Sequence, residues 1–163
     1  MSLGFNADEV LQMAERIERN GVRFYRAAAE ATTDPAFKER FVELAEMEVA
    51  HEQTFAGLRR ELSPEEKGTT AFDPQNETQA YLAAMADSEI FDDSKDPAEL
   101  VAQTSSPAEV LRVAIGLEKE SILFYLGLKD LVSARLGRDR VEGIIAEEQS
   151  HVALLKGQLL ALE

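Results

Sequence analysis

One pattern occurs twice in this chain with an offset of 100 residues: a lone glutamate followed, thirty residues later, by Glu-x-x-His. The first copy consists of Glu18, Glu48 and His51, and the second consists of Glu118, Glu148 and His151. The flanks repeat at the same offset, because Glu9-Val10-Leu11 recurs as Glu109-Val110-Leu111 and Phe24-Tyr25 recurs as Phe124-Tyr125. We therefore interpret the chain as two similar halves whose polar residues must meet in the fold.

Each of the six polar residues lies on an apolar stripe with the alternating three- and four-residue steps of a buried helix face. The stripes that carry Glu-x-x-His read Phe37, Phe41, Leu44, Glu48, His51, Phe55, Leu58, Leu62 and Val141, Ile144, Glu148, His151, Leu155. The stripes that carry the lone glutamates read Leu11, Ala14, Glu18, Gly21, Tyr25, Ala28 and Leu111, Ala114, Glu118, Ser121, Tyr125, Leu128. The spacing predicts that all six residues lie in the core of a helical bundle.

Helical periodicity and stop signals predict four long helices, over residues 7–31, 35–63, 107–136 and 138–163. Asp34-Pro35 provides a cap and a first turn for the second helix, and Ser106-Pro107 does the same for the third. No alternation of β-branched residues extends over the length of a strand. We therefore expect an all-α protein.

The lengths of the connections predict the topology. The first and last joins take only a few residues, so residues 7–63 and 107–163 each form an antiparallel hairpin. Residues 64–106 form a long crossover, in which an amphipathic run over residues 77–91 predicts a short fifth helix. Such a crossover lets the second and third long helices lie parallel, so we expect a ferritin-like four-helix bundle in a single domain, residues 1–163.

Composition excludes several kinds of site and partner. The chain has no cysteine, so any metal must be bound by carboxylate and imidazole, without disulfides or iron–sulfur clusters. The net charge of -14 argues against nucleic acid and anionic membranes as partners. No stretch approaches the roughly 20 apolar residues of a membrane span, and the N-terminus is acidic where a secretion signal is basic. We therefore expect a cytoplasmic protein.

Four glutamates and two histidines at one level of a bundle core require compensation of their charge. An ionised carboxylate buried without a partner is costly, so such groups neutralise, pair or bind a metal. No lysine or arginine lies on the same stripes at that level. Two divalent cations offset four negative charges, and carboxylates with one imidazole per metal suit iron or manganese better than structural zinc. The metal-free alternative is a set of protonated glutamates hydrogen-bonded to the histidines.

These residues resemble the ferritin-like di-iron carboxylate family, and within it the rubrerythrin branch, which shares the tyrosine seven residues after each lone glutamate. The resemblance spans nearly the whole chain. It implies two iron ions, Fe2+ or Fe3+, with manganese or zinc as alternatives. It also implies a role for each ligand: Glu48 and Glu148 bridge the metals, Glu18 and Glu118 are terminal, and His51 and His151 each bind one metal.

The chain departs from rubrerythrins in two respects. Rubrerythrins typically append a rubredoxin-like module with four cysteines, whereas this chain has none, which removes the built-in electron donor. They also tend to place a further glutamate one turn beyond the ligand of the third long helix, where this chain has Ser121. In the family, that glutamate is linked with an iron movement in efficient peroxide reduction.

Residues beside the six candidates are predicted to support the site. We expect Tyr25 and Tyr125, two turns beyond the lone glutamates, to assist catalysis by hydrogen-bonding ligand carboxylates and orienting them. Gly21 and Ser121, one turn beyond the same glutamates, leave room for a metal, water or oxygen. Glu147 is expected to be solvated.

Three functions remain as hypotheses. The first is a rubrerythrin-like oxidoreductase, acting in oxidative stress, that reduces hydrogen peroxide or dioxygen with electrons from Fe(II) or an external donor. The second is a ferroxidase that handles iron in a ferritin-like assembly. The third is a non-redox interaction module whose metal only braces the bundle. We expect a homo-oligomer, with a dimer as the expected state.

Overall fold

The computed structural model describes residues 6–68, 77–86 and 95–163. Its long helices are α1 (Ala7–Ala31), α2 (Pro35–Arg60), α6 (Pro107–Leu128) and α7 (Arg138–Leu162). Its short helices are α3 (Pro64–Gly68), α4 (Glu77–Ala86), α5 (Pro97–Ala102) and the 3₁₀ helix η2 (Lys129–Leu131). The described residues contain helices and no strand, which confirms the all-α prediction.

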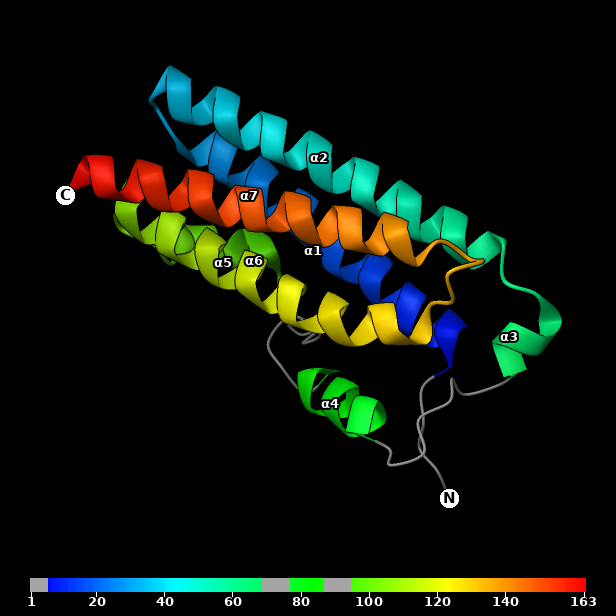
Figure 1. Cartoon of the computed structure of the whole chain (residues 1–163). Coiled ribbons are helices and arrows are strands. Elements are labelled where there is room, and N and C mark those ends of the chain that lie inside the picture. The colour runs from blue at the N-terminus through cyan, green and yellow to red at the C-terminus, as the bar shows by residue number, and fades with distance from the viewer. Residues whose placement is uncertain (1–5, 69–76, 87–94) are drawn as a thin grey trace.

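The four long helices lie side by side as a bundle (Figure 1). α1 and α2 pack as one antiparallel hairpin, and α6 and α7 pack as the other. α2 and α6 run in the same direction, because the chain returns along the bundle through the segment that contains α3, α4 and α5. This arrangement confirms the predicted ferritin-like bundle with one long crossover.

Side-chain caps start the long helices where the sequence predicts them. Asp34 accepts hydrogen bonds from two backbone N–H groups in the first turn of α2, at 2.8 and 3.4 Å, and Pro35 occupies that turn. Ser106 caps α6 by accepting one hydrogen bond, from the backbone N–H of Glu109 at 3.3 Å, and Pro107 follows it. α1 begins with a reciprocal capping box, in which Asn6 and Glu9 each accept a hydrogen bond from the backbone of the other.

The third long helix ends earlier than predicted. We expected it to continue to residue 136, but α6 ends at Leu128 and is followed by η2. Nε of Arg138 donates to the carbonyl oxygens of Lys129 and Val132, at 3.1 and 2.8 Å, which a continuing helix would pair with its own N–H groups. Gly137, with φ of 115°, then redirects the chain into α7.

The crossover holds more helix than predicted. α2 ends at Arg60, before the expected residue 63, and Pro64 opens the unpredicted helix α3. α4 confirms the fifth helix over residues 77–86, whereas residues 87–91 lie outside the described residues. The prediction also missed α5, although Asp96 caps its first turn and Pro97 follows, as at the start of α2.

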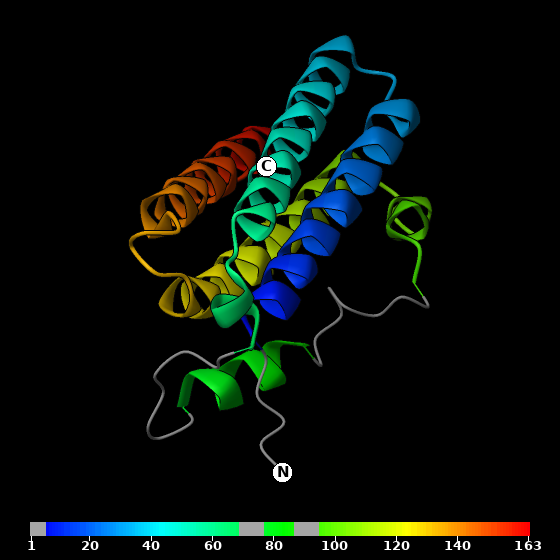
Figure 2. The same ribbon diagram turned by 90° about the vertical axis from the view of Figure 1, so that its right-hand side faces the viewer.

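Two of these short helices pack on the bundle. α5 lies beside α1 (Figure 2), where Arg23 on α1 forms a 2.8 Å ion pair with Asp96. α4 packs on α6, and the Tyr81 hydroxyl donates a hydrogen bond to the backbone carbonyl of Leu123. α5 therefore covers one side of the bundle at the level of the middle of α1.

The core consists of two apolar clusters with a polar layer between them. One cluster contains the beginnings of α1 and α7 and the ends of α2 and α6, and includes Leu11, Phe55, Leu58, Leu128 and Val141. The other contains the opposite ends of these helices, and includes Phe24, Phe41, Leu111, Leu155 and Leu159. The middle of every long helix is thus left for the polar layer.

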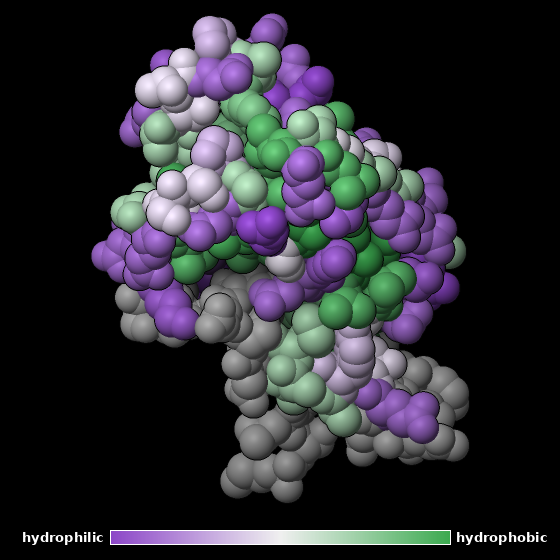
Figure 3. Space-filling model, turned by 90° about the vertical axis from the view of Figure 1, so that its left-hand side faces the viewer, coloured by the Kyte–Doolittle hydropathy of each residue, from purple (hydrophilic) through white to green (hydrophobic). Residues whose placement is uncertain are grey.

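The surface carries both hydrophobic and hydrophilic side chains, unlike the apolar clusters of the core. Figure 3 shows one end of the molecule, where hydrophobic residues lie between hydrophilic ones. Near the α1–α2 turn, a cavity of about 450 Å³ is lined by Phe37, Phe41 and Val101 among others, but by none of the six predicted site residues. No described helix is long and apolar enough to cross a membrane.

Candidate metal centre

The six predicted residues meet in the polar layer between the two apolar clusters. α1 supplies Glu18, α2 supplies Glu48 and His51, α6 supplies Glu118, and α7 supplies Glu148 and His151. All six are buried, with at most 4% of any of them exposed. The structure therefore brings together every residue of the repeated pattern.

The ligand-type atoms form two groups. Atoms from Glu18, Glu48, His51 and Glu148 all lie within 4.8 Å of one another, and so do atoms from Glu48, Glu118, Glu148 and His151. Glu48 and Glu148 belong to both groups, while each group has its own lone glutamate and its own histidine. This geometry suits two adjacent cations bridged by two carboxylates. That these residues bind metal stays a prediction.

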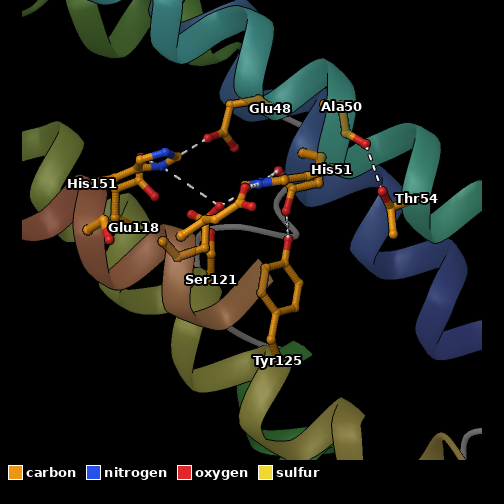
Figure 4. A network of polar contacts seen from close by, with 12 residues as sticks. Glu48, Ala50, His51, Thr54, Glu118, Ser121, Tyr125 and His151 are labelled. Atoms are coloured by element: carbon orange, nitrogen blue, oxygen red, sulfur yellow. Dashed lines mark hydrogen bonds and ion pairs between the residues drawn. The ribbon is translucent and has the colours of Figure 1, made fainter. Parts of the chain in front are cut away.

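Both imidazole rings turn Nδ1 toward the carboxylates. Nδ1 of His51 lies 2.7 Å from Oε1 of Glu148 and 3.5 Å from Oε2 of Glu18. Nδ1 of His151 lies 3.5 Å from Oε1 of Glu48, and Figure 4 shows these two side chains pointing toward each other. The two ring centroids are 6.0 Å apart, with 21° between the ring planes. Each ring thus directs one nitrogen into the site.

Many atoms of this cluster have no hydrogen-bond partner among the described residues. They are Oε2 of Glu18, Oε1 of Glu48, Oε2 of Glu148, and Nδ1 and Nε2 of His151. Nδ1 of His51 and Oε1 of Glu148 lie 2.7 Å apart as an ion pair, without the angles of a hydrogen bond. Most buried polar atoms in proteins are paired, so a cluster of unpaired ones requires an explanation. Cations bound to these oxygens and nitrogens would satisfy them, and the donor set fits a pair of iron or manganese ions.

The electrostatics of the cluster also favours cations. Burial, with repulsion from the other carboxylates, raises the pKa of Glu48 and of Glu148 well above 4.5. Burial alone would lower the pKa of His51, but its contacts with Glu148 and Glu18 raise it to about 11. Without metal, the cluster therefore retains protons that cations would replace.

The two predicted tyrosines cross from one hairpin to the other. Tyr25 on α1 donates its hydroxyl hydrogen to Glu118 on α6, and Tyr125 on α6 donates to Glu18 on α1. Figure 4 shows the Tyr125 hydroxyl directed into the cluster. Burial, followed by the nearby carboxylates, raises the pKa of both tyrosines well above 10, so both remain donors at neutral pH. The expected contact with ligand-type carboxylates is thus present.

Glu147, at the edge of the cluster, was not among the predicted site residues. Oε2 of Glu147 lies 2.6 Å from Nε2 of His51, although the Glu147 side chain is 56% exposed. We expected Glu147 to be solvated because it is turned away from Glu148 along α7. Its position directly before Glu148, off the apolar stripe, gave no signal of this contact, because the partner lies on another helix.

A small cavity of about 60 Å³ opens next to the cluster between α1, α5 and α6. Its wall includes Glu48 and Glu118, together with Gly21 and Ser121. A Cβ atom at Gly21 would lie 2.8 Å from Oε2 of Glu48, so this close approach requires glycine. The Ser121 hydroxyl donates to the backbone carbonyl of Leu117 at 3.0 Å. The cavity is large enough for a water-sized molecule.

Comparisons with known proteins agree with this architecture. A crystal structure of a protein from Thermotoga maritima, described as a ferritin-like diiron-carboxylate protein, has the same fold with a TM-score of 0.75. The two sequences are 24% identical, and the similarity covers 100% of each chain. No curated protein matches the sequence. The family model described as Rubrerythrin matches residues 9–159, and the chain therefore belongs to the rubrerythrin family.

Proposed function

We propose that this protein is a di-iron oxidoreductase that reduces hydrogen peroxide or dioxygen. The observation that carries the proposal is the pair of four-residue groups joined by Glu48 and Glu148. When bound, two adjacent iron ions would supply the two electrons that reduction of a peroxide bond requires. With two protons, those electrons convert one hydrogen peroxide into two waters. Membership of the rubrerythrin family supports the proposal.

The two four-residue groups indicate which residues would bind which ion. Glu18 and His51 would hold one ion, and Glu118 and His151 the other. Glu48 and Glu148 would contact both and set the separation of the two ions. We propose iron in both positions, with manganese and zinc as the alternatives that the donor set also permits.

Other residues would prepare and protect the site. Tyr25 and Tyr125 hold the two terminal carboxylates by hydrogen bonds and so reduce their motion before an ion binds. The apolar clusters close the polar layer toward both ends of the bundle. The cavity beside Gly21 and Ser121 offers peroxide or dioxygen a path to Glu48 and Glu118.

Electrons would come from outside the site. The 163 residues contain no cysteine to bind a rubredoxin-type iron, so we propose an external donor protein or Fe(II) as the reductant. We also propose a homo-oligomer, with a dimer as the expected state.

The test is anaerobic loading with Fe(II), followed by separate addition of hydrogen peroxide or dioxygen. We expect two irons per chain by metal analysis, and oxidation of both irons by Mössbauer spectroscopy. Faster oxidation by peroxide supports a peroxidase, and faster oxidation by dioxygen supports an oxidase or a ferroxidase. Two bound irons that respond to neither oxidant would contradict the proposal and leave a metal that only braces the bundle.

The iron-handling alternative differs in stoichiometry. A ferroxidase in a ferritin-like assembly would elute as a large hollow oligomer and retain many irons per chain after aerobic loading. Size-exclusion chromatography with metal analysis of each peak separates it from an oxidoreductase, which would elute as a small oligomer with two irons per chain.

A further inference from the structure

The two histidines of the site differ in the contact that their Nε2 atoms make. Nε2 of His51 lies 2.6 Å from Oε2 of Glu147. Nε2 of His151 is buried and has no hydrogen-bond partner among the described residues. With the offset of 100 residues, the position equivalent to Glu147 is Met47. A thioether is only a weak acceptor, so the second half lacks the carboxylate that the first half has.

The contact with Glu147 has a chemical consequence for His51. A neutral imidazole that donates its Nε2 hydrogen to a carboxylate carries its lone pair on Nδ1. Nδ1 is the atom that faces Glu18 and Glu148 in the site, at 3.5 and 2.7 Å. A carboxylate behind a histidine also fixes the ring rotation and makes the inner nitrogen a stronger ligand. Once a metal displaces the proton on Nδ1, Glu147 therefore holds the His51 ring in the orientation that a ligand requires.

His151 is not held in this way. Its Nδ1 points toward Glu48 and Glu118, at 3.5 Å from each, but no described side chain fixes the hydrogen on Nε2. When a metal binds at Nδ1, the hydrogen on Nε2 remains buried without an acceptor. The unpaired donor therefore weakens metal binding at the Glu118–His151 position and not at the Glu18–His51 position.

Glu147 contributes no apolar surface to the core. Its side chain is more than half exposed, and it approaches His51 from α7, outside the apolar clusters. Removing its carboxylate therefore leaves no cavity in the core. We propose that Glu147 is a positioning residue that orients His51, so that the Glu18–His51 position binds metal more tightly than the Glu118–His151 position and fills first. This inference rests on the proposed two-metal site.

The test is an anaerobic calorimetric titration of the metal-free protein with Fe(II), together with Glu147→Ala and the reciprocal change Met47→Glu. We expect two unequal binding steps in the wild type. Glu147→Ala should weaken the tighter step by about 10- to 100-fold and leave the weaker step unchanged. Met47→Glu, which offers His151 a carboxylate, should tighten the weaker step and make the two affinities more alike.

Thermal unfolding of the metal-free variants is the control: Glu147→Ala removes no apolar contact and should stay cooperatively folded, with a midpoint lowered only by the loss of the Nε2 contact of His51. If Glu147→Ala and the wild type bind two irons with the same affinities, the inference is wrong although the two-metal site stands. If the wild type binds fewer than two irons, the proposed function itself fails. Metal stoichiometry thus separates the two failures.

Discussion

The hydroxyl of Tyr25, in the first hairpin, donates a hydrogen bond to Glu118 in the second. The equivalent bond runs the other way, from Tyr125 to Glu18. Each half of the chain thus fixes a carboxylate that belongs to the other half. The positions of Glu18 and Glu118 therefore depend on the docking of the hairpins, and not on either hairpin alone.

Replacing Tyr25 by Phe should destabilise the metal-free protein. The change removes a hydrogen bond to a buried carboxylate, which contributes roughly 1.5–3 kcal/mol to folding. Urea unfolding of the metal-free protein measures the loss. The matched control is Tyr81→Phe, because Tyr81 donates to a neutral backbone carbonyl nearer the surface and should lose less. A loss at Tyr25 no larger than the loss at Tyr81 would count against this role.

The same tyrosines should protect the protein during turnover. Buried phenols next to an oxidising site can intercept stray oxidising equivalents, so we expect the double change Tyr25→Phe and Tyr125→Phe to increase oxidative damage. Mass spectrometry of oxidised side chains, after equal numbers of peroxide turnovers, measures it. Equal damage in the wild type and the double variant would reject the protective role.

Alanine at Glu48 should abolish binding of a metal pair. Glu48 belongs to both four-residue groups, so its loss removes an oxygen ligand from each position. Calorimetric titration should show at most one weak Fe(II) site per chain. Glu46→Ala is the control, because Glu46 lies two residues away on the exposed face of α2 and should keep both sites. Two tight sites in Glu48→Ala would remove Glu48 from the metal centre.

Alanine at Gly21 should weaken metal binding with little effect on the fold. The added Cβ would lie 2.8 Å from Oε2 of Glu48, which must move, and a carboxylate end can rotate away at low cost to folding. We expect about tenfold weaker Fe(II) binding, or about 1.4 kcal/mol, with a nearly unchanged midpoint in urea. Gly116→Ala on α6 is the control, since its Cβ would meet nothing within 4 Å. Equal affinities in the two variants would contradict the prediction.

The stability of the metal-free protein should fall as the pH rises above about 4.5. The raised pKa values of Glu48 and Glu148 mean that the folded state retains protons that the unfolded state releases, and His51 adds the same effect from pH 6.5 to about 11. Because the folded state binds more protons, the free energy of unfolding decreases with pH. Metal loading should reverse this slope, since bound cations require these groups without their protons.

Thermal unfolding at pH 5 and pH 8, with and without metal, measures the pH dependence of stability in both states. The midpoint should fall with pH without metal and rise with pH when metal is bound. Glu48→Gln should flatten the metal-free slope, because an amide does not titrate. A metal-free midpoint that rises between these pH values would show that the carboxyls of the cluster do not hold the extra protons.

The long helices and the six central residues were predictable because their signals are local. A cap such as Asp34-Pro35 and an apolar stripe interrupted by Glu48 and His51 are visible within one helix. The repeat then showed that four such stripes belong together. The sharing of Glu48 and Glu148 by both groups agrees with the bridging roles that the family resemblance implied.

Features that depend on contacts between distant segments were not predictable in this way. The end of α6 depends on Arg138, which reaches back to two carbonyl groups across a turn. The role of Glu147 depends on His51, 96 residues earlier on another helix. α5 is a different case, because its Asp96-Pro97 signal was present but the helix that follows has only 6 residues, too few for a periodic pattern.

The offset of 100 residues also bears on how such a site can change over generations. If two identical hairpins associated to form it, every substitution would occur on both sides at once, and the two metal positions would have to remain alike. Because one polypeptide encodes both hairpins, a mutation affects a single side. The pairs of equivalent positions Met47/Glu147 and Gly21/Ser121 hold differences that two identical hairpins could not have.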